Sequence, residues 1–154
     1  MSIKLTWFQK FSLARQIEAN DVIAAIAEAE TQTSAEIRVH FTTCKSNVDI
    51  LDDAKSVFEH LKMHETENRN AVLIYLRLKT KEIAIIGDQG IHMHVGDSFW
   101  LAVKDEAIQT IKAHTITEGI RKAVLLVGKQ LSRFFPPSDE NPNELPNEIT
   151  SGKI

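Results

Sequence analysis

Acids, histidines and glycines gather in residues 87–97, directly after an apolar run. The stretch contains Asp88, Gly90 and Asp97 and holds three of the six glycines of the chain. Glycine accepts positive φ and lets a ligand approach the backbone, and binding groups concentrate in loops that a rigid scaffold holds. We therefore interpret this stretch as a loop that forms one half of a binding site.

The second half of the site is predicted just before the most apolar run of the chain. Two carboxylates and two side-chain amides stand there, at Glu65, Glu67, Asn68 and Asn70. Carboxylate, amide and backbone carbonyl oxygens suit calcium or magnesium, not metals that prefer thiolates. The two stretches together predict a site for one or two divalent cations, with calcium placed above magnesium.

Simpler explanations exist for several of these residues. Asp97 also suits the cap of a helix that begins near Ser98, where its carboxylate would accept backbone amide hydrogens. Glu67 and Asn68 also suit a solvated turn. Glu118 is kept as an additional ligand, although complementarity to the dipole of a last helix capped by Thr117 explains it equally well.

Zinc and hydrolytic chemistry were weighed from the same residues. His92 and His94 have the spacing of zinc ligands on an extended segment, with His64 as a third candidate, but they also suit plain surface histidines. The chain has no Cys-x5-Arg loop, no Walker-type loop and no Asp-x-Asp pair, so no catalytic nucleophile is assigned. Hydrolysis of a phosphate ester would have to be metal-assisted, with Arg69 as the anion partner.

Periodicity predicts the elements that position these groups. Strict alternation in residues 36–41 predicts a strand whose Glu36, Arg38 and His40 face water or a sheet edge. Three residues, 79–81, separate the next two strands, which requires an antiparallel hairpin. Together the elements predict a three-layer α/β/α sandwich around a small mixed sheet of about four strands. The predicted helices are 21–30, 49–63, about 101–111 and 120–134, and the predicted strands are 36–41, 71–78 and 82–86.

Length and composition indicate one domain, since the chain has 154 residues with 43% hydrophobic and 25% charged residues. Residues 20–135 are assigned to this domain, and residues 1–19 to an amphipathic helix that packs on it or docks a partner. All four prolines fall in residues 136–154, which are also rich in acids. We interpret this segment as a flexible acidic tail.

The charge balance and the apolar runs exclude two kinds of partner. The tail carries a charge of -3, equal to the net charge of the whole chain, so the domain is near neutral and nucleic-acid binding is not expected. No signal peptide and no apolar run of ~20 residues is visible, which predicts a soluble cytoplasmic protein without membrane association. The single cysteine, Cys44, agrees with that compartment. A monomer is expected, and a protein partner is left open.

Several short segments in this order resemble a TPM domain, namely residues 34–39, 67–74, 85–91, 97–100 and 117–120. That family includes thylakoid-lumen acid phosphatase-like proteins of photosystem repair and many bacterial proteins. The resemblance covers about residues 20–135. Many relatives carry a signal peptide and a transmembrane or Gly/Ser-rich segment, neither of which is visible here. The chain therefore resembles a stand-alone, soluble bacterial-type member.

The resemblance implies an α/β/α sandwich, divalent-cation binding near the loops at one end of the sheet, and a phosphatase activity attributed to some members. By position, Glu67, Asn68 and Asn70 match the amide-bearing loop of the family, Asp88 and Gly90 its glycine loop, and Asp97 the acid that opens the next helix. We expect a cation-binding domain with a metal-responsive regulatory or partner-binding role. A metal-dependent phosphatase is the alternative, and a metal-free interaction scaffold is a third hypothesis.

Overall fold

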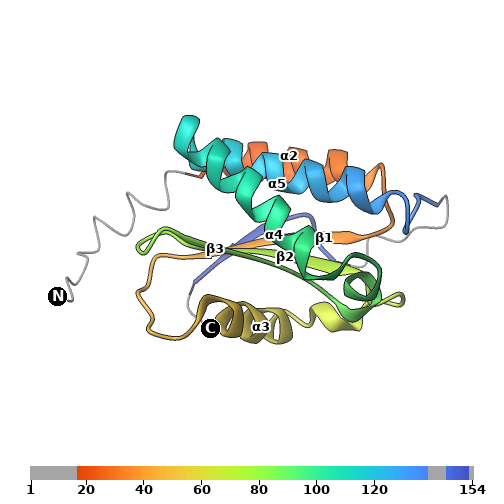
Figure 1. The fold of residues 1–154 in the computed structure, drawn as a ribbon, viewed down its shortest axis with the longest axis horizontal. Helices are drawn as coiled ribbons and strands as arrows, with labels where there is room; N and C mark the ends of the chain where they lie inside the picture. Colours follow the sequence, from red (N-terminus) through yellow and green to blue (C-terminus); the bar gives the residue numbers. More distant parts are fainter. Residues whose placement is uncertain (1–16, 139–144, 153–154) are drawn as a thin grey trace.

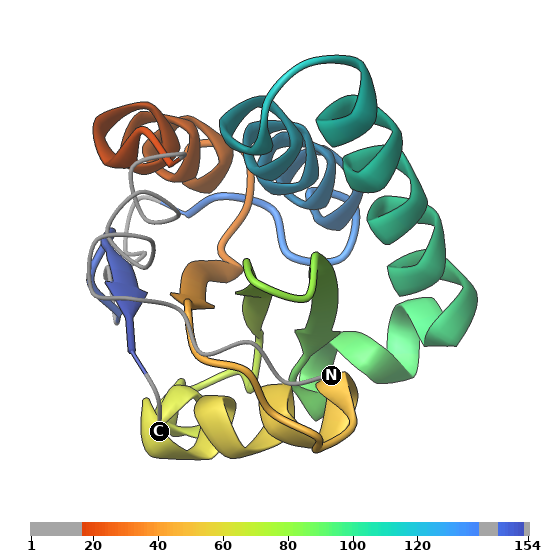
Figure 2. The ribbon, with the colours of Figure 1, turned by 90° about the vertical axis from the view of Figure 1, so that its left-hand side faces the viewer.

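Three layers make up the molecule, with helices on both faces of a central sheet (Figures 1 and 2). The computed structural model describes residues 17–138 and 145–152. Most of the amino-terminal segment predicted as a helix lies outside these residues. The helices are α2 (Ala19–Glu30), α3 (Ile50–His60), the short 3-10 helix η1 (Met63–Glu65), α4 (Gln89–Ala113) and α5 (Ile116–Leu131).

The sheet has four strands in the order β3-β2-β1-β4. β1 is parallel to β2 and to β4, whereas β3 is antiparallel to β2, to which it is joined by the predicted hairpin. The predicted three-layer sandwich around a mixed sheet is confirmed. The strands are β1 (Glu36–Thr42), β2 (Ala71–Arg77), β3 (Glu82–Gly87) and β4 (Ile149–Ser151).

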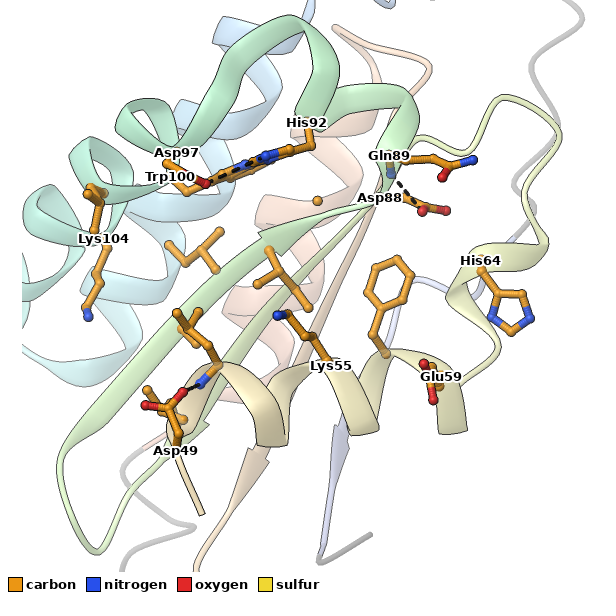
Figure 3. Close-up of a pocket in the computed structure, with 18 of the residues that line it drawn as sticks. Asp49, Lys55, Glu59, His64, Asp88, Gln89, His92, Asp97, Trp100 and Lys104 are labelled. Atoms are coloured by element: carbon orange, nitrogen blue, oxygen red, sulfur yellow. Dashed lines mark hydrogen bonds and ion pairs between the residues drawn. The ribbon is translucent and has the colours of Figure 1, made fainter. Parts of the chain in front are cut away.

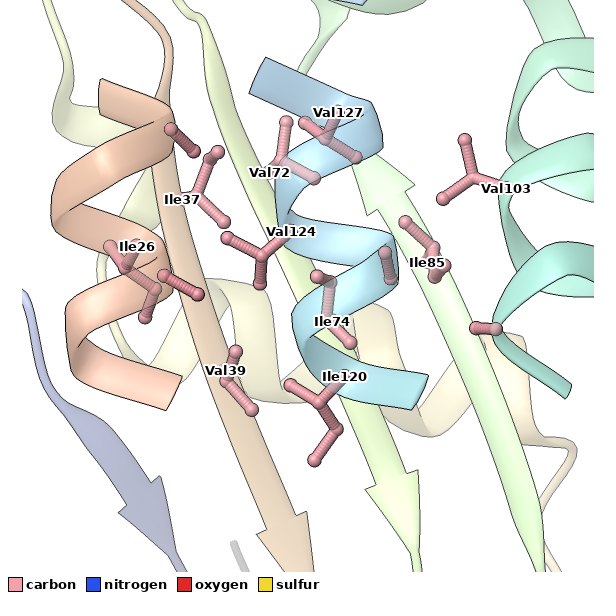
Figure 4. Close-up of a cluster of buried hydrophobic side chains, with 14 of the residues drawn as sticks. Ile26, Ile37, Val39, Val72, Ile74, Ile85, Val103, Ile120, Val124 and Val127 are labelled. Carbon is pink, nitrogen blue, oxygen red and sulfur yellow. The ribbon is translucent and has the colours of Figure 1, made fainter. Parts of the chain in front are cut away.

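One face of the sheet packs against α2, α4 and α5 through apolar side chains. Alternate residues of β1 and β2 point to this face because successive side chains of a strand alternate between faces. Figure 4 shows these strand residues meeting apolar side chains from the three helices. The labelled core residues are Ile26, Ile37, Val39, Val72, Ile74, Ile85, Val103, Ile120, Val124 and Val127.

The opposite face is covered by α3, η1 and the carboxy-terminal segment 145–152, and it is partly polar. Glu36, Arg38 and His40 were predicted to face water or an edge, but all three are buried. Arg38 Nη2 lies 2.6 Å from Glu148 Oε1. His40 Nδ1 lies 2.7 Å from Thr150 Oγ1. The prediction failed because residues far along the chain cover this face.

The end of the chain therefore corrects the tail prediction. Residues 149–151 form β4, which pairs with Val39, His40 and Phe41 at the outer edge of β1. The backbone N–H of Gly152 also donates to the carbonyl of Phe41 at 3.1 Å. A three-residue strand among polar residues has too little periodicity to be recognised from sequence, since its pairing with β1 decides its conformation.

Two helix starts also differ from prediction. α2 begins at Ala19 after Glu18, two residues before the predicted start, and Glu18 makes no side-chain cap. At the start of α5 the hydroxyl of Thr115 accepts from the backbone N–H of Glu118 at 3.1 Å, so Thr115 is the cap. Thr117, the predicted cap, instead accepts from the N–H of Glu18 at 3.0 Å.

Candidate functional site at the amino terminus of α4

Residues 89–95 are helical, which corrects the predicted loop. α4 begins at Gln89, and a kink at Gly96, with φ 70° and ψ -179°, separates its first two turns from the rest of the helix. Ile91 is fully buried and Val95, four residues later, packs against the same core. This helical spacing outweighs the glycine content, because a buried apolar stripe stabilises a helix more than single glycines weaken it.

Asp88 is the N-cap of α4 and is buried. Its Oδ1 accepts from the backbone N–H of Gln89 at 2.7 Å. The guanidinium of Arg69 forms a two-pronged ion pair with it, Nε to Oδ2 at 2.7 Å and Nη2 to Oδ1 at 2.9 Å. These hydrogen bonds raise the pKa of Arg69. Asp88 thus accepts from one backbone N–H at the start of the helix and pairs with one positive charge at the same time.

The two predicted halves of the site are in direct contact. β1 and β2 start at the same end of the sheet where β3 finishes, so the turn before β2 meets the start of α4. The N–H of Gly90 donates to the carbonyl of Arg69 at 3.0 Å. A Cβ at Gly90 would overlap the carbonyl oxygen of Asn68 and lie 2.6 Å from that of Arg69. Only glycine allows this close approach of two backbones.

The polar side chains of residues 65–70 point in different directions. Glu65, Glu67 and Asn68 are exposed. Asn70 is buried instead, and its Nδ2 donates to the carbonyl of Ser34 at 3.0 Å. Its Oδ1 has no hydrogen-bond partner among the described residues. Asn70 therefore connects the starts of β1 and β2.

Asp97 lies beyond the Gly96 kink and is almost fully exposed, with 92% of its side chain accessible. Its Oδ1 is 3.6 Å from His92 Nε2, while the Nε1–H of Trp100 donates to His92 Nδ1 at 3.2 Å. Figure 3 shows this group on α4, away from Asp88. Since the indole occupies one ring nitrogen, His92 has no lone pair there to act as a base.

The histidine pair does not form the zinc site that was weighed. Residues two apart on a helix point to different sides. His92 lines a groove, whereas His94 stacks on Phe134 with ring centroids 5.0 Å apart. His64 is exposed and lies at the far side of that groove (Figure 3).

Glu118 lies at the opposite end of the domain from Asp88. The residues after α5 touch the start of β1, as the N–H of Ser34 donates to the carbonyl of Phe135 at 2.9 Å. The start of α5 is therefore one helix length away, about 24 Å at 1.5 Å per residue. Glu118 pairs with Arg121 at 3.1 Å. The structure does not bring this predicted ligand to the site.

A groove of about 1210 Å³ runs between α3 and α4, and residues 84–87 of β3 line its base (Figure 3). Arg69, Asp88 and Asp97 also line it. We call it the α3–α4 groove. Trp100 and Lys104 from α4 and Lys55 from α3 contribute to it, and sequence reasoning missed all three. No sequence signal singled them out, because Lys55 lies on α3 and the other two on α4, and only the fold brings these helices together.

A family model described as the TPM domain matches residues 12–130 of this chain. The chain belongs to the TPM domain family. A solved structure of the BA42 protein from the psychrophilic bacterium Bizionia argentinensis is 35% identical to this TPM domain, with a TM-score of 0.81. The similarity covers 90% of this chain and 94% of that one. Known proteins with curated descriptions gave no match.

Two further solved structures share the fold of this TPM domain at lower identity. The amino-terminal domain of a protein from P. gingivalis is 17% identical with a TM-score of 0.62, covering 75% of this chain and 74% of that one. The amino-terminal domain of cg2496 from Corynebacterium glutamicum is 14% identical with a TM-score of 0.57, covering 84% and 75%. Within the described residues, no helix of the TPM domain is long and apolar enough to cross a bilayer.

The residues at the start of α4 include the oxygen donors that a divalent cation prefers. In this structure, however, Asp88 is paired with Arg69. The donors are the carboxylates of Asp88 and Glu67 and the backbone carbonyls beside Gly90, all of them oxygens. Both oxygens of Asp88 are already bonded to Arg69. Among the described residues, no three acidic, histidine or cysteine side chains form a metal-binding group. A cation fits this site of the TPM domain only in exchange for the guanidinium.

Proposed function

We propose that this TPM domain binds a divalent cation, calcium above magnesium, where residues 65–70 meet the start of α4. Asp88 would exchange its ion pair with Arg69 for the ion. The observation that carries the proposal is this ion pair: a buried carboxylate holds a positive charge at a point where the backbones of two segments meet. Cation binding is a proposal drawn from this geometry.

The charges allow such an exchange. The Arg69 side chain is 41% exposed, whereas that of Asp88 is 6% exposed. A partly exposed guanidinium can leave for water at small cost, but a buried carboxylate needs a positive partner. Asp88 also stays fixed by the N–H of Gln89 when Arg69 departs. A cation would therefore meet a carboxylate that is already in place.

Oxygen donors stand beside Asp88 on the turn. Glu67 and the Asn68 side chain are exposed, and the carbonyl of Asn68 lies against Gly90. Arg69 has φ 50°, the left-handed region that few non-glycine residues occupy. A cation that draws these groups together would change the order of the turn. Asp97 is assigned an outer role, because it pairs with His92 farther along the groove.

Release of Arg69 would let a partner sense that the cation is bound. Arg69 lines the α3–α4 groove, so its displacement moves a positive charge at the groove mouth. A partner bound there would respond to the cation through this local change in charge. We propose this as the metal-responsive role of the domain.

Calorimetric titration with calcium and with magnesium tests the proposal. Asp88→Asn should weaken binding by about tenfold or more, because it removes one of the few anionic donors. Arg69→Met should strengthen binding, since the competing guanidinium is gone. Arg133→Met, at an exposed position after α5, is the matched control and should bind as the wild type does. Equal affinity in wild type and Asp88→Asn would refute the site.

Phosphate ester hydrolysis is the alternative function, and Arg69 provides the observation in its favour. Once displaced from Asp88, its guanidinium would be free to pair with a phosphate. The calcium-loaded and magnesium-loaded proteins should then release phosphate from p-nitrophenyl phosphate in proportion to cation occupancy. Loss of turnover in both Asp88→Asn and Arg69→Met would support this alternative, and absence of turnover in the loaded wild type would remove it.

A further inference from the structure

Residues 145–152, which we call the strap, cover the outer edge of β1 (Figure 2). None of these residues is buried, and β4 within the strap pairs only with Val39, His40 and Phe41. The side chains that the strap contacts on β1, Arg38 and His40, are by contrast buried. Segments with few buried contacts open locally at low cost. The acceptor strand is therefore part of the core, whereas the strap is attached to its surface.

Two polar side chains of β1, Arg38 and His40, bind the strap from the same face of the strand, because they are two residues apart. Arg38 Nη2 lies 2.6 Å from Glu148 Oε1. His40 Nδ1 lies 2.7 Å from Thr150 Oγ1, and its Nε2 lies 2.9 Å from the carbonyl oxygen of Gly152. Because a carbonyl only accepts, Nε2 carries the proton and Nδ1 accepts from the threonine hydroxyl. β1 therefore selects a carboxylate and, two residues later, a hydroxyl group.

The backbone of β1 offers more pairing than the strap uses. The N–H of Glu36 donates to a carbonyl just before β2 at 3.1 Å. Since backbone groups alternate in direction along a strand, those of Ile37, Val39 and Phe41 point to the outer edge. β4 pairs with the last two of these, but the N–H of Ile37 donates to Glu30 Oε2 at 2.9 Å. At this position a side chain occupies the place of a strand.

The strap does not extend the pairing to this position. The N–H of Glu148 donates to the carbonyl of Pro146 at 3.0 Å, so the chain turns just before β4. Arg38 Nε also has no hydrogen-bond partner among the described residues. A strand without this turn would gain backbone pairing at Ile37, and a carboxylate placed to engage both Nε and Nη2 of Arg38 would bind more strongly. The strap of a second copy has the same turn, so these gains favour a different partner.

We propose that β1 is a docking site for an extended segment of a partner protein, which replaces the strap and lies parallel to β1. The segment carries a glutamate and, two residues later, a threonine or serine, with no proline just before the glutamate. Arg38 binds its carboxylate, His40 binds its hydroxyl, and the backbone of residues 37–41 supplies the hydrogen bonds. The strap covers the edge in the absence of the partner. This inference does not depend on cation binding.

Amide NMR of the full chain with synthetic peptides tests the proposal. The probe is a blocked peptide, Thr-Val-Thr-Val-Glu-Ile-Thr-Ser-Gly, which keeps residues 148–152 of the strap and replaces the preceding proline. Saturable shifts should concentrate at residues 37–42. A peptide copy of residues 145–152 should bind about fivefold more weakly, because its proline ends the pairing. A peptide with the glutamate and the second following residue, threonine, exchanged keeps composition and charge and should lose about tenfold in affinity.

Weakening the strap should strengthen binding of the probe. Glu148→Gln with Thr150→Val removes two side-chain contacts of the strap and leaves β1 unchanged. The affinity should rise about tenfold, because a segment of the same chain competes at high effective concentration. Glu106→Gln with Thr110→Val makes the same two changes on α4, which packs on β3 at the other edge of the sheet, and should leave the affinity unchanged. Equal affinity of the two double variants would overturn the proposal, as would equal binding of the probe and the exchanged peptide.

Hydrogen exchange in the wild type tests whether the strap opens by itself. The N–H groups of Val39 and Phe41 face the strap, whereas those of Arg38 and His40 face β2. The first pair should exchange at least about 100-fold faster than the second, because opening of the strap costs less than unfolding of the domain. Equal protection would overturn the proposal, since the strap would then leave only on unfolding. Shifts at residues 37–42 that depend on protein concentration without peptide would also overturn it, because they would identify a second copy as the occupant.

Discussion

The two faces of the sheet bury their strands by different chemistry. Under α2, α4 and α5 the strands present apolar side chains alone, and three helices exclude water. Under α3 the strands also present Glu36, Arg38, His40 and Arg77, all buried. A buried polar group is tolerated when a specific partner satisfies it. The first face therefore needs only apolar helices, whereas the second depends on particular polar partners.

Those partners come from segments distant in sequence. Asp53 on α3 accepts from the Tyr75 hydroxyl at 2.6 Å and from Arg77 Nε at 3.2 Å. Burial, together with the hydrogen bond to Asp53, raises the pKa of Tyr75. Glu148, in the carboxy-terminal segment, pairs with Arg38. The polar face thus holds α3 and β4 in position, and mutations should act on the two faces in different ways.

The largest loss of stability is expected on the apolar face. Ile74→Ala removes a fully buried side chain from the core. Loss of apolar contacts and the resulting cavity should lower the free energy of unfolding by about 2–5 kcal/mol. Urea denaturation measures this, with Met93→Ala as control, because Met93 is 79% exposed. A change below about 1 kcal/mol at Ile74 would show that this face is not closely packed.

On the polar face, Arg77→Met should lower the free energy of unfolding by less than Ile74→Ala does. The guanidinium is buried and lies 3.2 Å from Asp53 and 3.3 Å from Glu82. Both carboxylates are partly exposed and can regain water, so we expect a loss of about 2–3 kcal/mol, below the usual cost of stranding a buried charge. The double variant with Asp53→Asn should be less destabilised than the sum of the two changes in a double-mutant cycle. Simple additivity would contradict the coupling.

The free energy of unfolding should depend on pH through Glu30, which lies where β1 meets α2. Glu30 Oε2 accepts from the N–H of Ile37 at 2.9 Å. Burial chiefly raises the pKa of Glu30 from 4.5 to about 8, with Glu36 contributing. Between these two pH values the Glu30 carboxyl is ionised in the unfolded chain but keeps its proton in the folded protein. Its contribution to the free energy of unfolding is therefore complete below pH 4.5 and is lost as the pH rises toward 8.

Glu30→Gln isolates this effect, because the glutamine oxygen still accepts from Ile37. From pH 6.5 to 8 the wild type should lose about 1 kcal/mol more than the variant. Below 6.5 His40 acts in the opposite sense, since burial lowers its pKa and stability falls as the pH decreases. Urea denaturation at fixed pH values measures both. Parallel pH profiles of wild type and variant would refute the assignment to Glu30.

The smallest effect is expected at the exposed acid of the candidate site. Asp97→Asn, in the absence of added cations, should change the free energy of unfolding by less than about 0.5 kcal/mol. Asp88→Asn should cost about 1–2 kcal/mol, because it weakens a helix cap and an ion pair. Thermal unfolding of both variants provides the comparison. A larger cost at Asp97 would mean that its contact with His92 fixes α4.

Periodicity predicted most of the fold and part of the site. The alternation of Ile37, Val39 and Phe41 with polar residues predicted β1, and the short connection 79–81 predicted the hairpin. β4 was missed because its pairing with β1 is a long-range contact. The stretch 87–97 was taken for a loop because its glycines and histidines were weighed above the helical spacing of Ile91 and Val95.

The meeting of the two site halves was predicted from the order of the strands, and the structure brings them together. The ion pair between Arg69 and Asp88 was not predicted, because a sequence does not show which arginine pairs with which aspartate. Such a pair depends on side-chain positions that only the assembled sheet defines. The same holds for Lys55 and Lys104, which belong to separate helices.

The exchange at Asp88 is tested most directly by following the Nε–Hε signal of Arg69 by NMR during a calcium titration. In the cation-free protein this hydrogen is bonded to Asp88 Oδ2. We predict that its signal moves to the position of a solvated arginine, in step with the amide signals of Asp88 and Gly90. Saturable amide shifts with an unchanged Arg69 signal, or no shifts at millimolar calcium, would contradict the exchange.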